Sequence, residues 1–507
     1  MLMKTINLSL VVVLMIIINI NYGQTTQINF KSKKSKGITV NQKSLLILWD
    51  KVIFTNNKSI MYCDSATYNR SNNSFIAYRN IRINENDSLE LFGDSLHYFG
   101  DRQEAFIYGN VELNTNDINL TAPSLIFNQK EKIAEYSEGA IINDKKEGYT
   151  IKSKKGTLKT KISTIYFKEN VILNHPEYNI SSDTLIYNTN FQNTTIIGKT
   201  KISSKNSVIN CQKGWFNNRT KKSSLKGNIF IESKNHTFFA DSIFYNEISG
   251  LSYAKGNVKI IDDSSNIMIE GNYGYHSENI DSSHIWNNSI LTQSDSTDTL
   301  KIYADQFIRR KDTIKEEIFC FNNVIIDGTQ IQGDCDSIYF NETDSIMKCI
   351  IQPIIWLDST QVTGDKVEFK IHKGIVYKMD IENNAIIITK KDSVHYDQIK
   401  GNTIHGFFKE NKINLMDING NGEVIYYSEN ESDSTITELN KIKCEKMKIF
   451  LNKNKISSIN FFSNPSGNTQ PIKENDKGLF FDDFHIFLRR SYLEKYNEAK
   501  GDLLNGK

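Results

Sequence analysis

The residues in this chain that could do chemistry recur at regular intervals. Aspartate followed by serine or threonine stands at 64–65, 94–95, 183–184, 241–242 and 336–337. Carboxylates of this kind can bind Ca²⁺ or act as acid catalysts. A catalytic site, however, occurs once in a chain, whereas these pairs return along its whole length. Asp and Ser side chains also bond nearby backbone groups where a strand bends, and the repetition favours this structural role.

No other pattern predicts catalysis. The chain contains no G-x-S-x-G, H-E-x-x-H or C-x-x-C sequence and no phosphate-binding loop, and its nine His are scattered. We therefore expect a protein that is not an enzyme and that uses no metal or cofactor. The 61 basic and 59 acidic residues leave a net charge of +2, which gives no reason to expect nucleic acid as a partner.

The six cysteines invite a disulfide interpretation if the chain is exported. Four of them instead share one position of a repeat with small residues, and Cys behaves there as a small buried residue. This position holds Cys63, Cys211, Cys335 and Cys444, and elsewhere Gly93, Ala122, Ser182, Ala240 and Ala304. We expect these four to be unpaired core thiols. Cys320 and Cys349 lie off this position, and both states stay open for them.

The repeat has a period of about 30 residues, which is typical of a solenoid or array. Two columns of residues mark it. The first-corner column holds Asp64, Asp94, Pro123, Lys154, Asp183, Gln212, Asp241, Asn272, Asp305, Asp336, Asp365, Asn402 and Glu445. The second-corner column holds Asn80, Asn110, Ala140, Asn170, Lys199, Asn228, Asn257, Asn288, Asn323, Pro353, Asn384 and Asn421. Two strands per unit, about 4.7 Å apart, predict a rod on the order of 120 Å.

The stretch Leu89–Leu113 shows how one unit is built. It predicts a strand over 89–99, a turn at 100–102 and a second strand over 104–113. In the first strand the apolar residues stand at odd-numbered positions up to Leu91 and at even-numbered positions at Leu96 and Tyr98. Side-chain direction has a period of two, so this shift would move them to the other face of a straight strand.

The second strand of the unit shows a similar break in the apolar pattern. Phe106 and Tyr108 are expected to point inward, and Val111 and Leu113 continue after Gly109-Asn110. A bend or bulge at each corner would keep both halves of a strand facing one interior. The predicted unit is therefore a pair of strands, each folded over at its middle.

The apolar side chains on the inner side of such strands are candidates to line a groove for acyl chains. They are Leu91, Leu96, Tyr98, Phe106, Tyr108, Val111, Leu113, Val171, Leu185, Tyr187, Phe238, Ile243, Tyr245, Val258 and Ile260. Apolar burial stabilises by about 25 cal/mol per Å², so a lipid tail needs no special motif. A closed core and an open trough fit the same pattern.

The ends of the chain differ from the repeat. Lys4 and the apolar run 8–18 predict a signal peptide over 1–23. A polar, mobile leader is expected over 24–44, the repeat over 45–462, and a linker with a short helix over 463–507. The helix would begin at Asp482 or Asp483 and place Phe484, Leu488, Tyr492 and Tyr496 on one face. We expect this helix to cap the last rung of the array.

The repeated motifs resemble those of the OstA/LptA-type family of lipopolysaccharide-transport proteins. They include G-D-S-L-H-Y at 93–98 with A-F-I-Y-G-N-V-E-L at 105–113, and A-D-S-I-F-Y at 240–245 with A-K-G-N-V-K-I at 254–260. The resemblance covers 45–460. It implies an all-β fold, an elongated antiparallel jelly roll or "β-taco" solenoid of bent strands.

The same resemblance implies a function in the periplasm, with association to the outer membrane. Such a protein carries lipopolysaccharide from an inner-membrane extraction complex to an outer-membrane translocon and holds lipid A tails in the groove. The implied partners are lipopolysaccharide, the transport proteins of both membranes and, by end-to-end association, further copies. The bridge role fits better than the translocon role, because the repeats run almost to the end of the chain.

Other functions remain alternatives. The first is a cell-surface structural protein or adhesin, built as a parallel β-helix without lipid transport; hairpin turns inside each repeat argue against it. An outer-membrane barrel needs straight alternating strands, which the shifts in apolar phase disfavour. A polysaccharide-processing enzyme ranks last.

Overall fold

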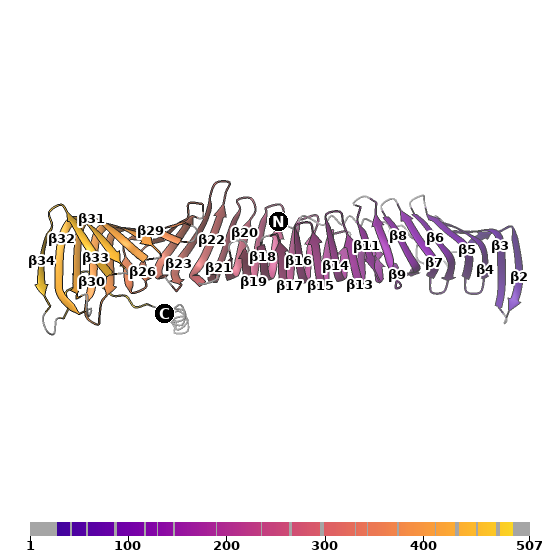
Figure 1. Cartoon of the computed structure of the whole chain (residues 1–507). Helices are drawn as coiled ribbons and strands as arrows, with labels where there is room; N and C mark the ends of the chain where they lie inside the picture. The colour runs from indigo at the N-terminus through magenta and orange to yellow at the C-terminus, as the bar shows by residue number, and fades with distance from the viewer. Residues whose placement is uncertain are drawn as a thin grey trace. The chain divides into compact units, whose positions relative to one another are not determined.

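The fold of this chain is known from a computed structural model. It describes residues 28–489 except 41–42, 57–58, 86–88, 116–117, 129, 146–147, 189, 235, 263–265, 295–298, 330, 342, 373–374, 411, 431–434, 453–454 and 473–476. The chain divides into unit 1, up to Ser252, and unit 2, from Tyr253. The described residues form strands β1 to β34, with no α-helix among them and a 3-10 turn η2 (Thr160–Ile162) (Figure 1). The predicted all-β fold is confirmed.

Unit 1 contains the strands up to β18. They are β1 (Asn29–Lys31), β2 (Lys34–Val40), β3 (Lys43–Asn56), β4 (Ser59–Asn69), β5 (Ser74–Glu85), β6 (Leu89–Phe99), β7 (Glu104–Thr115), β8 (Ile118–Asn128), β9 (Ile133–Tyr136), β10 (Ala140–Asp144), β11 (Thr150–Ser153), β12 (Lys155–Lys159), β13 (Thr164–Asn174), β14 (Tyr178–Asn188), β15 (Asn193–Ser204), β16 (Ser207–Asn217), β17 (Lys222–Ser233) and β18 (His236–Asn246). Most strands span both sides of a corner, whereas β9/β10 and β11/β12 are interrupted there.

Unit 2 begins within β19, which starts two residues before the division. Its strands are β19 (Leu251–Asp262), β20 (Ile267–Ser277), β21 (Ser282–Ser294), β22 (Thr299–Lys311), β23 (Glu316–Asp327), β24 (Ile331–Asn341), β25 (Ile346–Ile350), β26 (Ile354–Leu357), β27 (Thr360–Thr363), β28 (Lys366–His372), β29 (Ile375–Lys390), β30 (Tyr396–Lys409), β31 (Lys412–Glu429), β32 (Ile436–Asn452), β33 (Lys455–Phe462) and β34 (Ser466–Pro471). The longest strands lie after about residue 370, where the repeat spacing of the sequence also lengthens.

Strand pairing mostly follows chain order within each unit. The exceptions include β1, which pairs with β3, and the short strands at an interrupted corner, where β8 pairs with β10, β9 with β12 and β11 with β13. The hairpin predicted over 89–113 is confirmed as β6 and β7, with Leu91 opposite Leu113 and Phe99 opposite Glu104. The described pairings of unit 1 from β3 to β18 and those of unit 2 from β20 to β34 are antiparallel. The alternative of a parallel β-helix is therefore wrong.

The second corner is a bulge made by two residues in the left-handed region. In β7, Gly109 and Asn110 have φ of 74° and 45°, and in β5 Arg79 and Asn80 have φ of 60° and 49°. The register shifts at these residues against both neighbouring strands. Gly and Asn adopt this conformation most readily, which explains why Gly-Asn recurs in the second-corner column.

The first corner supplies a hydrogen bond to the second. Asn110 donates its amide Nδ2 to the Asp94 carboxylate at 3.0 Å. The same bond joins Asn80 to Asp64 at 2.9 Å and Asn323 to Asp305 at 3.0 Å. These aspartates are therefore structural, and their spacing follows from one hydrogen bond repeated along each unit.

The bulge corrects the predicted orientation of β7. Ile107 is buried at 4% exposure, whereas Tyr108 is 46% exposed. Phe106 stacks on Tyr108 with ring centroids 6.4 Å apart, and Val111 and Leu113 are buried. Phe106 and Tyr108 thus lie on the outer face. The two left-handed residues lengthen the interval between inward side chains to four, so β7 keeps an odd-numbered inner set across its corner.

The polar leader predicted over 24–44 is also partly wrong. Residues 29–31 and 34–40 form β1 and β2, which pair with the two ends of β3. β2 carries Lys34 and Lys36 on exposed positions. Lysines are common on edge strands because they discourage pairing with other chains, so a polar composition there does not exclude a strand. The predicted signal peptide lies outside the described residues.

The C-terminal segment differs from the predicted helix. Asp482 and Asp483 form a turn, and 484–489 contain no helix or strand. The segment bonds to Gln361 on β27 and to Gln398 on β30. Tyr492 and Tyr496, the other residues of that predicted helix, lie outside the described residues.

Candidate functional site

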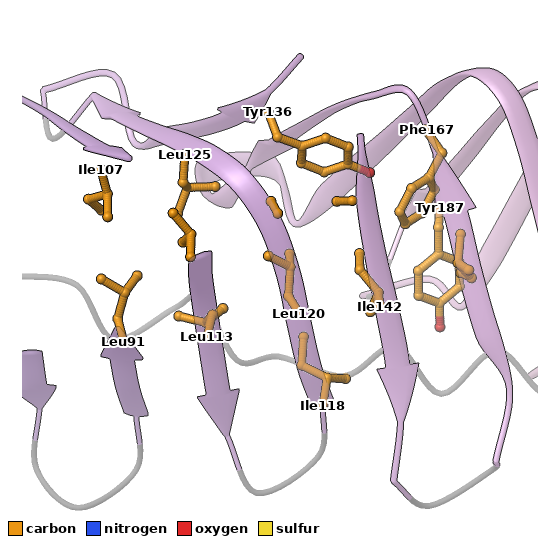
Figure 2. Packing of buried hydrophobic residues seen from close by; sticks show 14 of the residues in the cluster. Leu91, Ile107, Leu113, Ile118, Leu120, Leu125, Tyr136, Ile142, Phe167 and Tyr187 are labelled. Carbon is orange, nitrogen blue, oxygen red and sulfur yellow. The ribbon is translucent and has the colours of Figure 1, made fainter. Parts of the chain in front are cut away.

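The candidate functional site is the apolar interior of the bent strands. In unit 1 a single cluster of buried side chains runs from Leu48 on β3 to Ile229 on β17. Figure 2 shows part of it: Leu91, Ile107 and Leu113 point into the same space as Leu125 and Ile142. Long strands such as β7, β13 and β17 contribute residues from both sides of their corners, and the cluster is continuous from β3 to β17. Unit 2 has a separate cluster from Leu291 to Ile449.

The interior is filled by its own side chains. Leu48, Phe167 and Ile196 have 0% exposure, and Val111 and Leu113 have 1%. Protein interiors are packed to the density of organic crystals. Of the two arrangements that the sequence left open, the described residues therefore show the closed one.

The structure places most of the predicted groove residues on the inner face. Leu91, Leu96, Val111, Leu113, Val171, Leu185, Tyr187, Tyr245 and Val258 are buried. Tyr98 and Ile243 are partly buried against the cluster of unit 1, and Phe238 and Ile260 are half-buried. Phe106 and Tyr108 lie outside, as described above.

Sequence reasoning missed several large inner side chains. Phe167, Tyr136 and Tyr149 are buried in unit 1. Burial and then the nearby Asp144 carboxylate raise the pKa of Tyr149 well above its ordinary value. Tyr149 precedes β11 and continues the alternation of Ile151 and Ser153, and that alternation is the signal that could have identified it.

The cysteines lie in this interior as free thiols. All six are buried. Burial raises the pKa of Cys63 to about 12 and that of Cys211 to about 11, and a thiol that stays protonated is a poor nucleophile. Cys320 and Cys349, left open by the sequence, are free and buried as well.

We expect no reaction between the native chain and an aromatic disulfide reagent, and titration of all six thiols after unfolding without reductant. The variant Tyr108→Cys should add one rapidly reacting thiol, because position 108 is exposed. Release of fewer than six equivalents from the unfolded native chain would show that some cysteines are paired.

Ionisable groups in the interior of unit 2 gather around Asp397. Its Oδ2 lies 3.4 Å from Lys391 Nζ, and its Oδ1 accepts a hydrogen bond from the Tyr427 N–H at 2.9 Å. Glu429 binds the same lysine at 2.6 Å. Burial raises the pKa of Asp397 to about 6, although Lys391 opposes that shift. The network lies at the ends of β29, β30 and β31, and Lys391 offsets only part of the cost of burying the Asp397 charge.

The raised pKa predicts a pH dependence. Asp397 holds its proton more tightly in the folded chain than in the unfolded chain, where its pKa has the ordinary value of 3.8. Its contribution to stability is therefore full below about pH 3.8 and declines as the pH rises to about 6. The variant Asp397→Asn lacks this decline. Between pH 3.5 and 7 the free energy of unfolding of the native chain should fall relative to that of Asp397→Asn by up to about 3 kcal/mol. Urea unfolding of both chains at the two pH values measures this change. A constant difference would contradict the raised pKa.

In the part of the chain that the structure describes, no group of three or more His, Cys, Asp or Glu side chains could hold a metal ion. Within those same residues, no helix is long and apolar enough to cross a membrane.

Comparison with known proteins finds a family-model match in the N-terminal part of the repeat. The family model described as OstA-like protein matches residues 28–183, which run from β1 into β14. No curated protein matches the chain. Among solved structures, the chain is similar to LptH, described as the LptA homologous periplasmic component of the conserved lipopolysaccharide transport device from Pseudomonas aeruginosa. The identity is 17%, the match covers 28% of this chain and 94% of that chain, and the TM-score is 0.22.

Proposed function

We propose that this chain, which is OstA-like over residues 28–183, is a periplasmic lipopolysaccharide carrier. It bridges an inner-membrane extraction complex and an outer-membrane translocon and holds lipid A acyl chains in its apolar interior. The observation that carries the proposal is the continuous apolar cluster of unit 1, which runs from β3 to β17. The motif resemblance over 45–460 supports the same function along the rest of the repeat.

The size of the expected lipid contact suits the interior. Burying one CH₂ group contributes about 0.8 kcal/mol, so a dozen CH₂ groups contribute roughly 10 kcal/mol. Leu, Ile, Val and Phe side chains that could contact such a chain recur along the cluster of unit 1. Recognition of an acyl chain therefore needs no single conserved motif, and the function can be distributed along the array.

A closed interior must open before it accepts a lipid. In the ladder of unit 1 most strands pair with their neighbours in chain order, for example β6 with β5 and β7. The two sides of the bent strands face each other through side chains such as Ile107 and Leu113 (Figure 2). Moving these sides apart about the corners would exchange side-chain packing for lipid contact and would leave the ladder intact.

Binding of lipopolysaccharide with and without its acyl chains tests this function. We expect the full-length chain to bind intact lipopolysaccharide and to lose at least tenfold in affinity for the fully deacylated molecule, measured by equilibrium binding below the micelle concentration. Equal affinities would show that the saccharide, and not the apolar interior, is what the chain recognises. The variant Tyr108→Ser, on the outer face, is the matched control and should bind like the native chain.

A further inference from the structure

A second apolar layer covers the outer face of unit 2. Ile425, Tyr427 and Leu439 form a small core with Phe481, which is 7% exposed. These sheet residues point away from the interior, because Val424, next to Ile425, belongs to the interior cluster. Leu479 and Phe484 pack against the same core. Figure 1 shows the chain turning back from the β34 end of unit 2 to reach this face.

Two buried glutamines hold the backbone of this segment. Gln398 on β30 has 0% exposure. It donates Nε2 to the Leu479 carbonyl at 2.7 Å and accepts from the Phe481 N–H at 2.9 Å through Oε1. Gln398 thus bonds both a carbonyl and an N–H group of the segment's backbone, as a neighbouring β-strand would.

The second glutamine repeats this arrangement further along the segment. Gln361 on β27, 4% exposed, donates Nε2 to the His485 carbonyl at 2.8 Å and accepts from the Phe487 N–H at 2.9 Å. Burying a side-chain amide without hydrogen-bond partners destabilises the folded chain. Two such amides on one sheet face would be costly unless an extended segment lay against them.

Further contacts fix the direction of the segment. The Tyr427 hydroxyl accepts from the Leu479 N–H at 2.9 Å, and the Tyr396 ring meets Phe484 edge-on at 5.4 Å. Lys400 pairs with Asp483. The backbone bonds are independent of sequence, whereas Leu479, Phe481 and Phe484 provide the selectivity.

We propose that the outer face formed by β27, β30 and β31 is a peptide-docking site, and that it can take residues 478–489 from a second copy of this chain. The contacts would be the same in trans as in cis, which is the condition for exchange of an element between copies. The segment of the same copy occupies the site because its effective concentration is high. The proposal does not depend on lipid transport.

A labelled peptide covering residues 477–489 tests this site in the full-length chain. The variant Phe481→Asp should displace the chain's own segment, and the peptide should then bind with a saturable rise in fluorescence anisotropy. Adding Gln398→Leu or Gln361→Leu to that variant should weaken binding at least tenfold. Gln306→Leu, whose amide contacts His284 and not the segment, should leave binding unchanged.

The native chain should bind the peptide at least tenfold more weakly than Phe481→Asp, because its site is filled. Binding to neither chain, equal binding to both, or binding that ignores both glutamine substitutions would overturn the proposal. If Phe481→Asp does not fold, a protease site placed at 473–476 of the native chain replaces it. After cleavage the released segment should exchange with the labelled peptide, and failure to exchange would count against the proposal equally.

Discussion

The variant Ile107→Asp should lower the free energy of unfolding by more than about 3 kcal/mol, whereas Tyr108→Asp should lower it by less than about 1 kcal/mol. The two residues are adjacent on β7 and face opposite ways. Ile107 is 4% exposed within the cluster of unit 1, and Tyr108 is 46% exposed. A carboxylate at 107 would be buried without a partner, while one at 108 would remain in water. Chemical unfolding followed by far-ultraviolet circular dichroism measures both.

This pair also tests the orientation of the second strand in each unit. The sequence predicts that Tyr108 lies inside, and the structure places Ile107 there instead. A larger loss for Tyr108→Asp than for Ile107→Asp would restore the sequence-based assignment. Similar losses at both positions would mean that the strand is buried on both faces.

The variant Gly109→Val should lower the free energy of unfolding by about 2–4 kcal/mol. Gly109 has φ of 74°, which a β-branched residue adopts with strain. A Cβ at this position would also lie 2.3 Å from Asp94 Oδ2. Gly37→Val is the matched control, because a Cβ there has no atom within 4 Å, and its loss should stay below about 1 kcal/mol.

A double variant separates the two causes of that loss. Gly109→Val with Asp94→Ala removes the carboxylate that the new side chain meets, so it should recover part of the loss from Gly109→Val, after the cost of Asp94→Ala alone is subtracted. The part that remains is the strain of the left-handed backbone. Strict additivity of the two substitutions would contradict the contact between the corners.

The sequence predicts the corner columns well because each column has a local physical cause. Asp94 and Asn110 recur in type because one bonds the other across neighbouring strands. The shift from Leu91 to Leu96 is confirmed, since both are buried. In β7, however, Ile107 and Tyr108 are both apolar, so alternation alone could not decide which of them faces inward.

The C-terminal segment shows where local sequence cannot decide. Phe484 and Leu488 have helical spacing, but the backbone of that segment bonds to Gln361 and Gln398, which lie more than 80 residues away in the sequence. Such long-range hydrogen bonds are invisible to periodicity. The closed interior could not be predicted either, because an open trough and a packed core require the same alternation of apolar side chains.

The most direct measurement of lipid binding in the interior is photocrosslinking to lipopolysaccharide in cells. A photoreactive residue at Leu96 or Ile243, which lie on the inner face of unit 1, should yield a lipopolysaccharide adduct. The same residue at Tyr78 or Tyr108, both exposed on the outer face, should yield at most a tenth as much. Adducts from the outer positions alone would contradict the proposal that this interior carries lipid.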